Sequence, residues 1–142
     1  AIGYSAAFYG LGPTVDPRVS LLAGEAGEGF IAAYWAYHPD VDEPGPTLYR
    51  ELCDQNNVPA KMRGLYHYYG FATAHVLVEG LRKAGKYPTR ERMMKGLETL
   101  HKWESGVFPP ITYSRNDHAG VESVILLQLQ GGKQVAITDW RN

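Results

Sequence analysis

The sequence predicts an α/β protein whose chain passes twice between two bodies. Apolar residues recur at three- and four-residue spacing over residues 65–84, which indicates one buried face of an α-helix. Strand-length apolar runs lie on either side of this helix, at residues 30–37 and 121–140. Two proline- and glycine-rich linkers, residues 38–46 and 103–110, bracket the helical part. The sequence lacks the repeated βαβ units that a free-standing parallel sheet needs.

The first predicted helix begins at Pro17, because Asp16 before it is a good N-cap and proline suits the first helical position. Its apolar face is expected to consist of Val19, Leu21, Leu22 and Ala26. Residues 30–37 then form a continuous apolar and aromatic run, which fits a strand covered on both faces. A buried helical turn fits the same run.

Three helices follow the first linker. One runs from about Pro46 to Asn57, the second covers residues 65–84, and the third runs from its N-cap Thr89 to about Leu100. The residues expected to face inward are Leu48, Leu52 and Cys53 in the first of these helices. In the second they are Phe71, Ala74, Leu77 or Val78, Leu81 and Ala84, and in the third Met93, Met94, Leu97 and Leu100.

The C-terminal part of the sequence is strand-like. Residues 111–114 alternate like a strand, and residues 115–120 read as a polar turn. Residues 121–130 and 134–140 are then predicted to pair as a hairpin, because Gly131-Gly132 between them is typical of a type I′ turn.

The amino-acid composition excludes several classes of protein and of site. The chain has 142 residues, 44% of them hydrophobic, which suffices for a buried core and suggests one domain. A formal net charge of −1 argues against a nucleic-acid-binding protein. No apolar run approaches the length of a membrane span. The single cysteine, Cys53, excludes an internal disulfide and a cysteine-rich zinc site and reads as a small buried residue.

No catalytic motif, cofactor-binding motif or metal-binding pattern stands out. His75 and Glu79 are four residues apart on a helix, which suits two metal ligands or, more commonly, an exposed side-chain pair. Asp117 and His118 could perform acid–base chemistry, but polar turn residues more often bond their own backbone. We therefore expect no enzyme activity, no cofactor and no metal.

Two places could carry ligand contacts. Glu28 lies between two glycines just before the apolar run, where its carboxylate could meet a ligand at a strand end or stay in a solvated loop. Tyr66, His67, Tyr68 and Tyr69 are four consecutive ring residues that cannot all face one core. Either one of them points into a cleft or an interface, or two pack inside and two lie at the surface.

Four parts of the sequence together carry a family resemblance. They are LAGEAGEGFIAAYW (22–35), YYGFATAHVLVEGLRKAG (68–85), TRERMMKGLETL (89–100), and PPITYSRNDHAG followed by LLQLQGGKQVAITDW (109–140). In this order they resemble the C-terminal portion of type I periplasmic solute-binding proteins of ABC transporters, in the branch of the leucine/isoleucine/valine-binding proteins. The resemblance extends from about residue 19 onward.

The resemblance implies two Rossmann-like lobes that close on a ligand between them. Residues 1–37 would belong to the second lobe, and residues 38–46 would be a hinge crossover. Residues 47–103 would be the helical block of the first lobe, residues 104–112 would cross back, and residues 113–142 would form the C-terminal hairpin of the second lobe. The chain would then be an incomplete α/β fold whose partner is the missing N-terminal portion of the same protein.

The resemblance also implies site residues and a function. An acid in the position of Glu28 binds the ligand ammonium group, and an aromatic residue in the position of Tyr68, with Tyr66 and Tyr69 beside it, flanks the ligand side chain. The protein would deliver a branched-chain or other amino acid, or an aromatic acid, to an ABC permease. It would be periplasmic or extracellular, with a lipid anchor in a Gram-positive cell. The alternative is a ligand-sensing module of the same fold that acts on a signalling partner.

Overall fold

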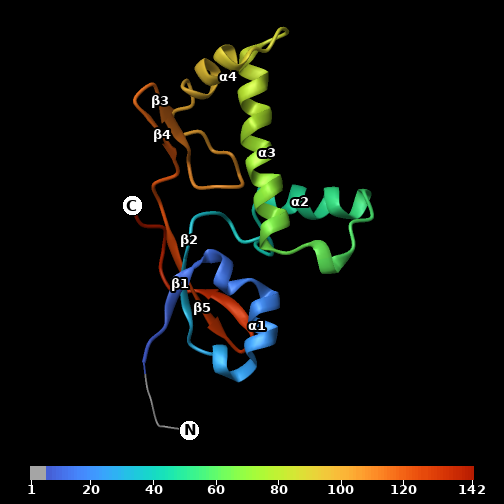
Figure 1. Cartoon of the computed structure of the whole chain (residues 1–142), viewed down its shortest axis with the longest axis vertical. Coiled ribbons are helices and arrows are strands. Elements are labelled where there is room, and N and C mark those ends of the chain that lie inside the picture. The colour runs from blue at the N-terminus through green and yellow to red at the C-terminus, as the bar shows by residue number, and fades with distance from the viewer. Residues whose placement is uncertain (1–5) are drawn as a thin grey trace. The chain divides into compact units, whose positions relative to one another are not determined.

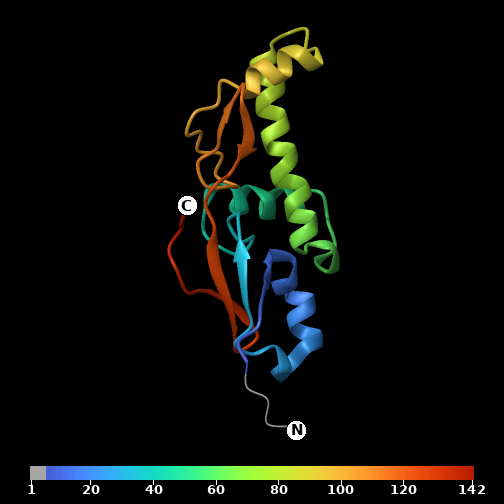
Figure 2. The ribbon, with the colours of Figure 1, turned by 60° about the vertical axis from the view of Figure 1, so that its left-hand side comes forward.

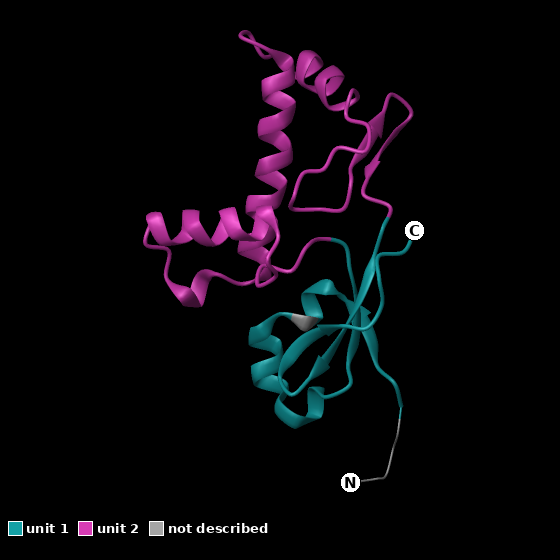
Figure 3. Ribbon diagram, turned by 180° about the vertical axis from the view of Figure 1, so that it is seen from behind, with its two compact units in different colours: residues 1–35, 123–142 teal, residues 36–122 magenta. Residues whose placement is uncertain are grey.

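The computed structural model of the chain describes residues 6–142 and divides into two compact units (Figure 3). Unit 1 consists of residues 1–35 and 123–142, and unit 2 of residues 36–122. The first five residues of the predicted second-lobe segment lie outside the described residues. Residues 113–122, which the resemblance assigns to the C-terminal hairpin of the second lobe, lie in unit 2 with the helices. The assignment of lobes and hinges stays a prediction.

Unit 1 is built on a four-stranded sheet (Figure 1). Its strands are β1 (Tyr9–Leu11), β2 (Ile31–Tyr34), β5 (Ile125–Gln130) and β6 (Lys133–Ala136), in that spatial order. β1 and β2 pair in parallel, whereas β2 with β5 and β5 with β6 pair in antiparallel. The predicted type I′ turn is confirmed, since both Gly131 and Gly132 have positive φ angles between β5 and β6. β1 had no counterpart in the sequence-based prediction.

The helix α1 (Pro17–Ala23) connects the two parallel strands and lies beside the sheet (Figure 2). Its predicted cap is confirmed, because the Asp16 carboxylate accepts a hydrogen bond from the Arg18 backbone N–H over 2.9 Å. Its predicted apolar face is wrong: the side chain turned inward is Ser20, while Leu21 and Leu22 are 83% and 88% exposed. The helix is too short for spacing alone to identify the face that meets the sheet.

The strand β2 forms the centre of the unit 1 core. Ala32 and Tyr34 are buried, and Leu127 and Leu129 of β5 are buried with them, as their alternation in the sequence predicts. The strand is shorter than the predicted run over residues 30–37, because ladder pairing with β5 ends at Tyr34.

Unit 2 contains the three expected helices. They are α2 (Pro44–Gln55), α3 (Leu65–Ala84) and α4 (Arg90–Leu97). The predicted N-cap of α4 is confirmed, because the Thr89 hydroxyl accepts a hydrogen bond from the Arg92 backbone N–H over 3.2 Å. α2 begins two residues earlier than expected, since prolines are accepted in the first turn of a helix.

The buried faces of these helices agree with the predicted ones at Cys53, Ala84 and Leu100 and differ at most other positions. α2 buries Tyr49 and Cys53, while Leu48 and Leu52 are partly exposed. α3 buries Leu65, Tyr68, Ala72, Gly80 and Ala84, whereas Ala74, Leu77, Val78 and Leu81 are exposed. The reason is the position of its neighbours: α2 meets the first half of α3 through Tyr49, and α4 meets the second half through Gly96.

A small hairpin completes unit 2. β3 (Thr112–Ser114) pairs in antiparallel with β4 (Asp117–Gly120), so the segment predicted as a polar turn contains a strand. Alternation of apolar and polar residues is the usual strand signal, and Asp117-His118 does not show it. Within residues 6–142, no helix combines the length and apolar character that a membrane span requires.

Candidate ligand-binding site

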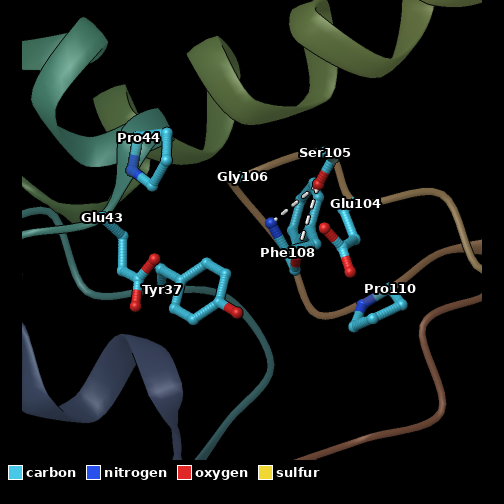
Figure 4. Close-up of a pocket in the computed structure, with 8 residues that line it drawn as sticks. All are labelled: Tyr37, Glu43, Pro44, Glu104, Ser105, Gly106, Phe108 and Pro110. Carbon is cyan, nitrogen blue, oxygen red and sulfur yellow. Dashed lines mark hydrogen bonds between the residues drawn. The ribbon is translucent and has the colours of Figure 1, made fainter.

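A cavity of about 270 Å³ lies in unit 2 between the segment that leads into α2 and the segment that follows α4 (Figure 4). These two segments correspond to the proline- and glycine-rich linkers of the sequence. The residues that line the cavity are Tyr37, Glu43, Pro44, Glu104, Ser105, Gly106, Phe108 and Pro110.

Backbone hydrogen bonds hold the two segments together. The Tyr37 N–H donates to the Val107 carbonyl oxygen, and the Gly45 N–H donates to the Gly106 carbonyl oxygen, each over 3.1 Å. A Cβ atom on Gly45 would overlap with the Gly106 carbonyl, so the close approach requires glycine there. The cavity wall is therefore fixed by main-chain geometry.

Ser105 holds the second segment in its curved shape. Its hydroxyl oxygen accepts hydrogen bonds from the N–H groups of Val107 (3.3 Å) and Phe108 (3.0 Å). The same hydroxyl lies 3.3 Å from the Phe108 carbonyl oxygen, to which it can donate. This short-range pattern sets where Phe108 lies along the cavity wall.

The cavity has acidic character. Partial burial raises the pKa of the Tyr37 hydroxyl, and the nearby carboxylates of Glu43 and Glu104 raise it further. None of the eight lining residues is lysine or arginine. Two carboxylates, a phenol hydroxyl and the apolar surfaces of Phe108 and Pro110 together suit a small cation that carries an apolar group.

Glu28, expected to bind a ligand ammonium group, lies in unit 1 and holds the tip of the β5–β6 hairpin. Its two carboxylate oxygens accept hydrogen bonds from the N–H groups of Gly131 (2.9 Å) and Gly132 (3.0 Å). It precedes β2, at the amino end of that strand. Ligands in open α/β sheets bind at carboxyl ends. The structure thus gives Glu28 a structural role, and its ligand role stays a prediction.

Tyr68, expected at the mouth of a cleft, is a core residue of unit 2. It is 0% exposed, and its ring meets Tyr49 edge-on at a centroid distance of 5.1 Å. Burial raises the pKa of its hydroxyl above the ordinary value, and that hydroxyl lies 3.5 Å from the Val107 carbonyl oxygen. Tyr66 is 64% exposed and Tyr69 is half-buried, so the cluster divides between core and surface.

The same order of elements occurs in a known family. The sequence profile of the periplasmic binding proteins matches residues 1–134. The chain belongs to the periplasmic binding protein family. No curated protein matched the chain. The family members are substrate-binding proteins and not enzymes.

Solved structures of periplasmic binding proteins contain this fold. A branched chain amino acid ABC transporter protein from Thermus thermophilus with bound valine is 25% identical, with a TM-score of 0.89 over 99% of this chain. A substrate binding protein from Aeropyrum pernix is 20% identical (TM-score 0.79, 99% of this chain), and a leucine binding protein from Thermotoga maritima 19% (TM-score 0.70, 99%). The chain covers 40%, 39% and 39% of those chains, and so matches a fragment of the type I fold.

Sequence reasoning predicted none of the eight residues that line the cavity in this periplasmic binding protein, including the three that give it acidic character: Tyr37, Glu43 and Glu104. Tyr37 was read as the end of a strand, and both acids lie within the segments read as linkers, 38–46 and 103–110. The sequence offered one indication of this cavity: each of the two proline- and glycine-rich linkers contains a glutamate. Proximity of the two linkers could not be read from either one alone.

The remaining candidates have ordinary partners. Glu79 pairs with Arg82 at 3.7 Å and with Lys83 at 3.9 Å, while His75 stacks on Trp103. Asp117 accepts a hydrogen bond from the backbone N–H two residues on, and His118 lies 3.2 Å from Glu98. Cys53 is buried. In the part of the chain that the structure describes, no three potential metal ligands come together.

Proposed function

We propose that this protein captures an amino acid outside the cytoplasm and delivers it to an ABC importer. The observation that carries the proposal is the likeness to the Thermus thermophilus protein with bound valine, which extends over 99% of the chain at 25% identity. Capture in a two-lobed protein would proceed by closure of the lobes on the ligand, without covalent chemistry.

The acidic cavity supports a ligand with an ammonium group over a plain aromatic acid. Glu43 and Glu104 would attract the ammonium group, because both carboxylates already act on Tyr37 at the same cavity. A charge-assisted hydrogen bond to such a group contributes about 1.5–3 kcal/mol. Phe108, Pro44 and Pro110, which line the cavity, would contact the apolar part of the ligand.

The site residues inferred from the resemblance fall into two groups in this proposal: Tyr66 and Tyr69 have exposed or half-buried side chains, whereas Glu28 and Tyr68 already make contacts within the protein. Tyr66 is exposed and available for contact with a ligand side chain. Tyr69 is half-buried beside it. Glu28 and Tyr68 would act on a ligand only if their present contacts, to the hairpin turn and to Tyr49, were exchanged for ligand contacts.

Isothermal titration calorimetry on the full-length protein tests the proposal. Valine, leucine and phenylalanine are compared with phenylpropionate, which has the ring and the carboxylate but no ammonium group. We expect at least one amino acid to bind and phenylpropionate to bind more weakly. Glu104→Gln and Glu43→Gln should each weaken the amino acid about ten- to a hundredfold.

Glu51→Gln is the matched control, because Glu51 is an exposed acid on α2 that does not line the cavity. Its variant should bind as the parent protein does. Equal affinity for phenylpropionate and phenylalanine would contradict the ammonium-binding role. Absence of binding for every amino acid would contradict the ligand class itself. Stimulation of the cognate permease's ATPase activity by the loaded protein tests delivery.

A further inference from the structure

Charge is distributed very unevenly along this chain. Residues 82–102 contain seven of its 14 Lys and Arg residues but only two of its 15 Asp and Glu residues. This segment thus has a formal charge of +5, and the remainder of the chain has −6. The near-neutral total conceals a strongly basic region, and a local charge of this size is an argument about partners.

The basic residues gather at one end of unit 2. They lie on the last turn of α3, on the turn that follows it, on α4 and on the segment beyond α4, and that turn projects past both helices (Figures 1 and 2). All seven side chains are exposed: Arg82, Lys83, Lys86, Arg90, Arg92, Lys95 and Lys102. We refer to these seven residues together with Tyr87 as the basic tip.

Nearby acids neutralise only part of this charge. Glu79 lies 3.7 Å from Arg82, and Glu91 lies 2.8 Å from Lys95. Glu98 lies 3.2 Å from His118, and its charge also acts on Lys95. Within residues 6–142, no carboxylate lies at ion-pair distance from four of the cations. These are Lys86, Arg90, Arg92 and Lys102.

An aromatic residue stands at the end of the tip. Tyr87 is 69% exposed, and the Lys86 ammonium lies 5.5 Å from its ring centroid. The Arg92 guanidinium donates a hydrogen bond to the Tyr87 carbonyl oxygen over 3.0 Å, which fixes the turn against α4. Tyrosine flanked by cations is the composition found where proteins meet the polar boundary of a bilayer.

A hollow of about 400 Å³ lies beside the turn. It is lined by Lys83, Ala84, Arg92, Lys95, Gly96 and Thr99. Two lysines and one arginine are donors that suit phosphate oxygens. The Thr99 hydroxyl donates its proton to the Gly96 carbonyl oxygen over 2.7 Å, and Lys95 also contacts Glu91 over 2.8 Å. Gly96 allows α4 to approach α3 closely, because a Cβ atom there would lie 2.8 Å from the Lys83 Cβ and 3.1 Å from the Gly80 carbonyl oxygen.

We propose that the basic tip docks on a bilayer surface that carries anionic phospholipids, with a headgroup phosphate in the hollow. Charge complementarity supports an anionic bilayer as the partner, because its negative surface attracts each lysine or arginine that lies near it. An acidic protein is the other possible partner, but the centre of a protein interface is depleted of charge. Here three of the seven cations, Lys83, Arg92 and Lys95, line the hollow. No residue of the basic tip lines the acidic cavity, so the two proposals can be tested independently.

Vesicle co-sedimentation of the full-length protein tests this proposal. Vesicles of phosphatidylcholine with about one-third phosphatidylglycerol, within the range where polybasic segments bind, are compared with vesicles of phosphatidylcholine alone. We expect binding to the anionic vesicles only, and loss of it at high salt. The double variant Lys86→Gln/Arg90→Gln should lower partitioning about 25-fold, because each cation contributes about fivefold. Tyr87→Ser should lower it further.

The matched control is Lys61→Gln/Lys133→Gln, which removes two exposed cations outside the basic tip. It should partition as the parent protein does. The proposal is overturned if the control loses as much binding as the Lys86/Arg90 variant, if neutral vesicles bind equally well, or if no vesicle binds. Competition by excess glycerol phosphate would show that the hollow accepts a free phosphate ester. The Lys86/Arg90 variant should bind amino acids with the same affinity as the parent protein. This result would separate the test of membrane docking from the test of the transport proposal.

Discussion

The backbone N–H of Gly45 donates a hydrogen bond to the carbonyl oxygen of Gly106 over 3.1 Å, across 61 positions of the sequence. The contact joins the start of α2 to the segment that follows α4. It leaves no room for a side chain on Gly45, since a Cβ there would also overlap with the Val107 side chain. The acidic cavity is lined by both of the segments that this contact joins.

Gly45→Ala should therefore destabilise unit 2. The added methyl group must push the two segments apart, and overpacking of this kind costs about 1–3 kcal/mol. Gly70→Ala is the control, because Gly70 lies within α3 with open space around its Cα and alanine favours a helix by about 0.5–1 kcal/mol. Urea unfolding of both variants checks this. Equal midpoints for the two variants would contradict the role of the close approach.

Tyr68→Ala should lower the free energy of unfolding by about 3–5 kcal/mol, as expected for an aromatic core residue replaced by alanine. Tyr68 is fully buried against Tyr49 and Phe71. Tyr66→Ala should change stability by less than about 0.5 kcal/mol, since that side chain is exposed. Thermal melts of the two variants separate them, and similar losses in both would mean that Tyr68 is not a core residue.

Glu28→Ala should loosen the β5–β6 turn without unfolding the sheet. The two glycine N–H groups lose the carboxylate that accepts from them, and water takes its place. We expect hydrogen exchange at Gly131 and Gly132 to accelerate about tenfold or more, while Leu127 in the middle of β5 keeps its protection. Unchanged exchange at both glycines would show that Glu28 does not hold the turn in solution.

Stability should fall at alkaline pH. Burial raises the pKa of the Tyr49 and Tyr68 hydroxyls above their ordinary value, so the folded protein keeps protons that the unfolded chain releases. Stability is therefore complete below about pH 10, where unfolded tyrosine begins to ionise, and declines as the pH rises above it. A buried tyrosine contributes a slope of about 1.4 kcal/mol per pH unit in this range.

Tyr68→Phe tests the origin of this slope. It removes the ionisable hydroxyl but keeps the ring in the core, and the hydroxyl it loses is 3.5 Å from its acceptor, at the limit of a hydrogen bond. Denaturant unfolding at a series of pH values should give a shallower decline above pH 10 for this variant than for the parent chain. The same decline in both would assign the slope to other groups.

Local signals predicted the ends of several elements correctly. Asp16 and Thr89 cap α1 and α4 because each accepts a hydrogen bond from a backbone N–H two or three residues away. The Gly131-Gly132 turn follows in the same way from the positive φ angles that glycine allows. These features depend on neighbours within a few residues. The ordered motifs likewise identified the family, since their order is itself a property of the sequence.

The sequence by itself thus determined the helices, the hairpin turn and the family, whereas the tertiary structure decided which side chains are buried and which groups meet. Tyr68 is in the core because α2 crosses α3 at Tyr49, and Glu28 bonds to a turn 103 residues away. The cavity exists because the two linkers approach through Gly45. Helical spacing gives the direction of each side chain relative to its own helix, but burial depends on the element packed against it, which lies far away in the sequence.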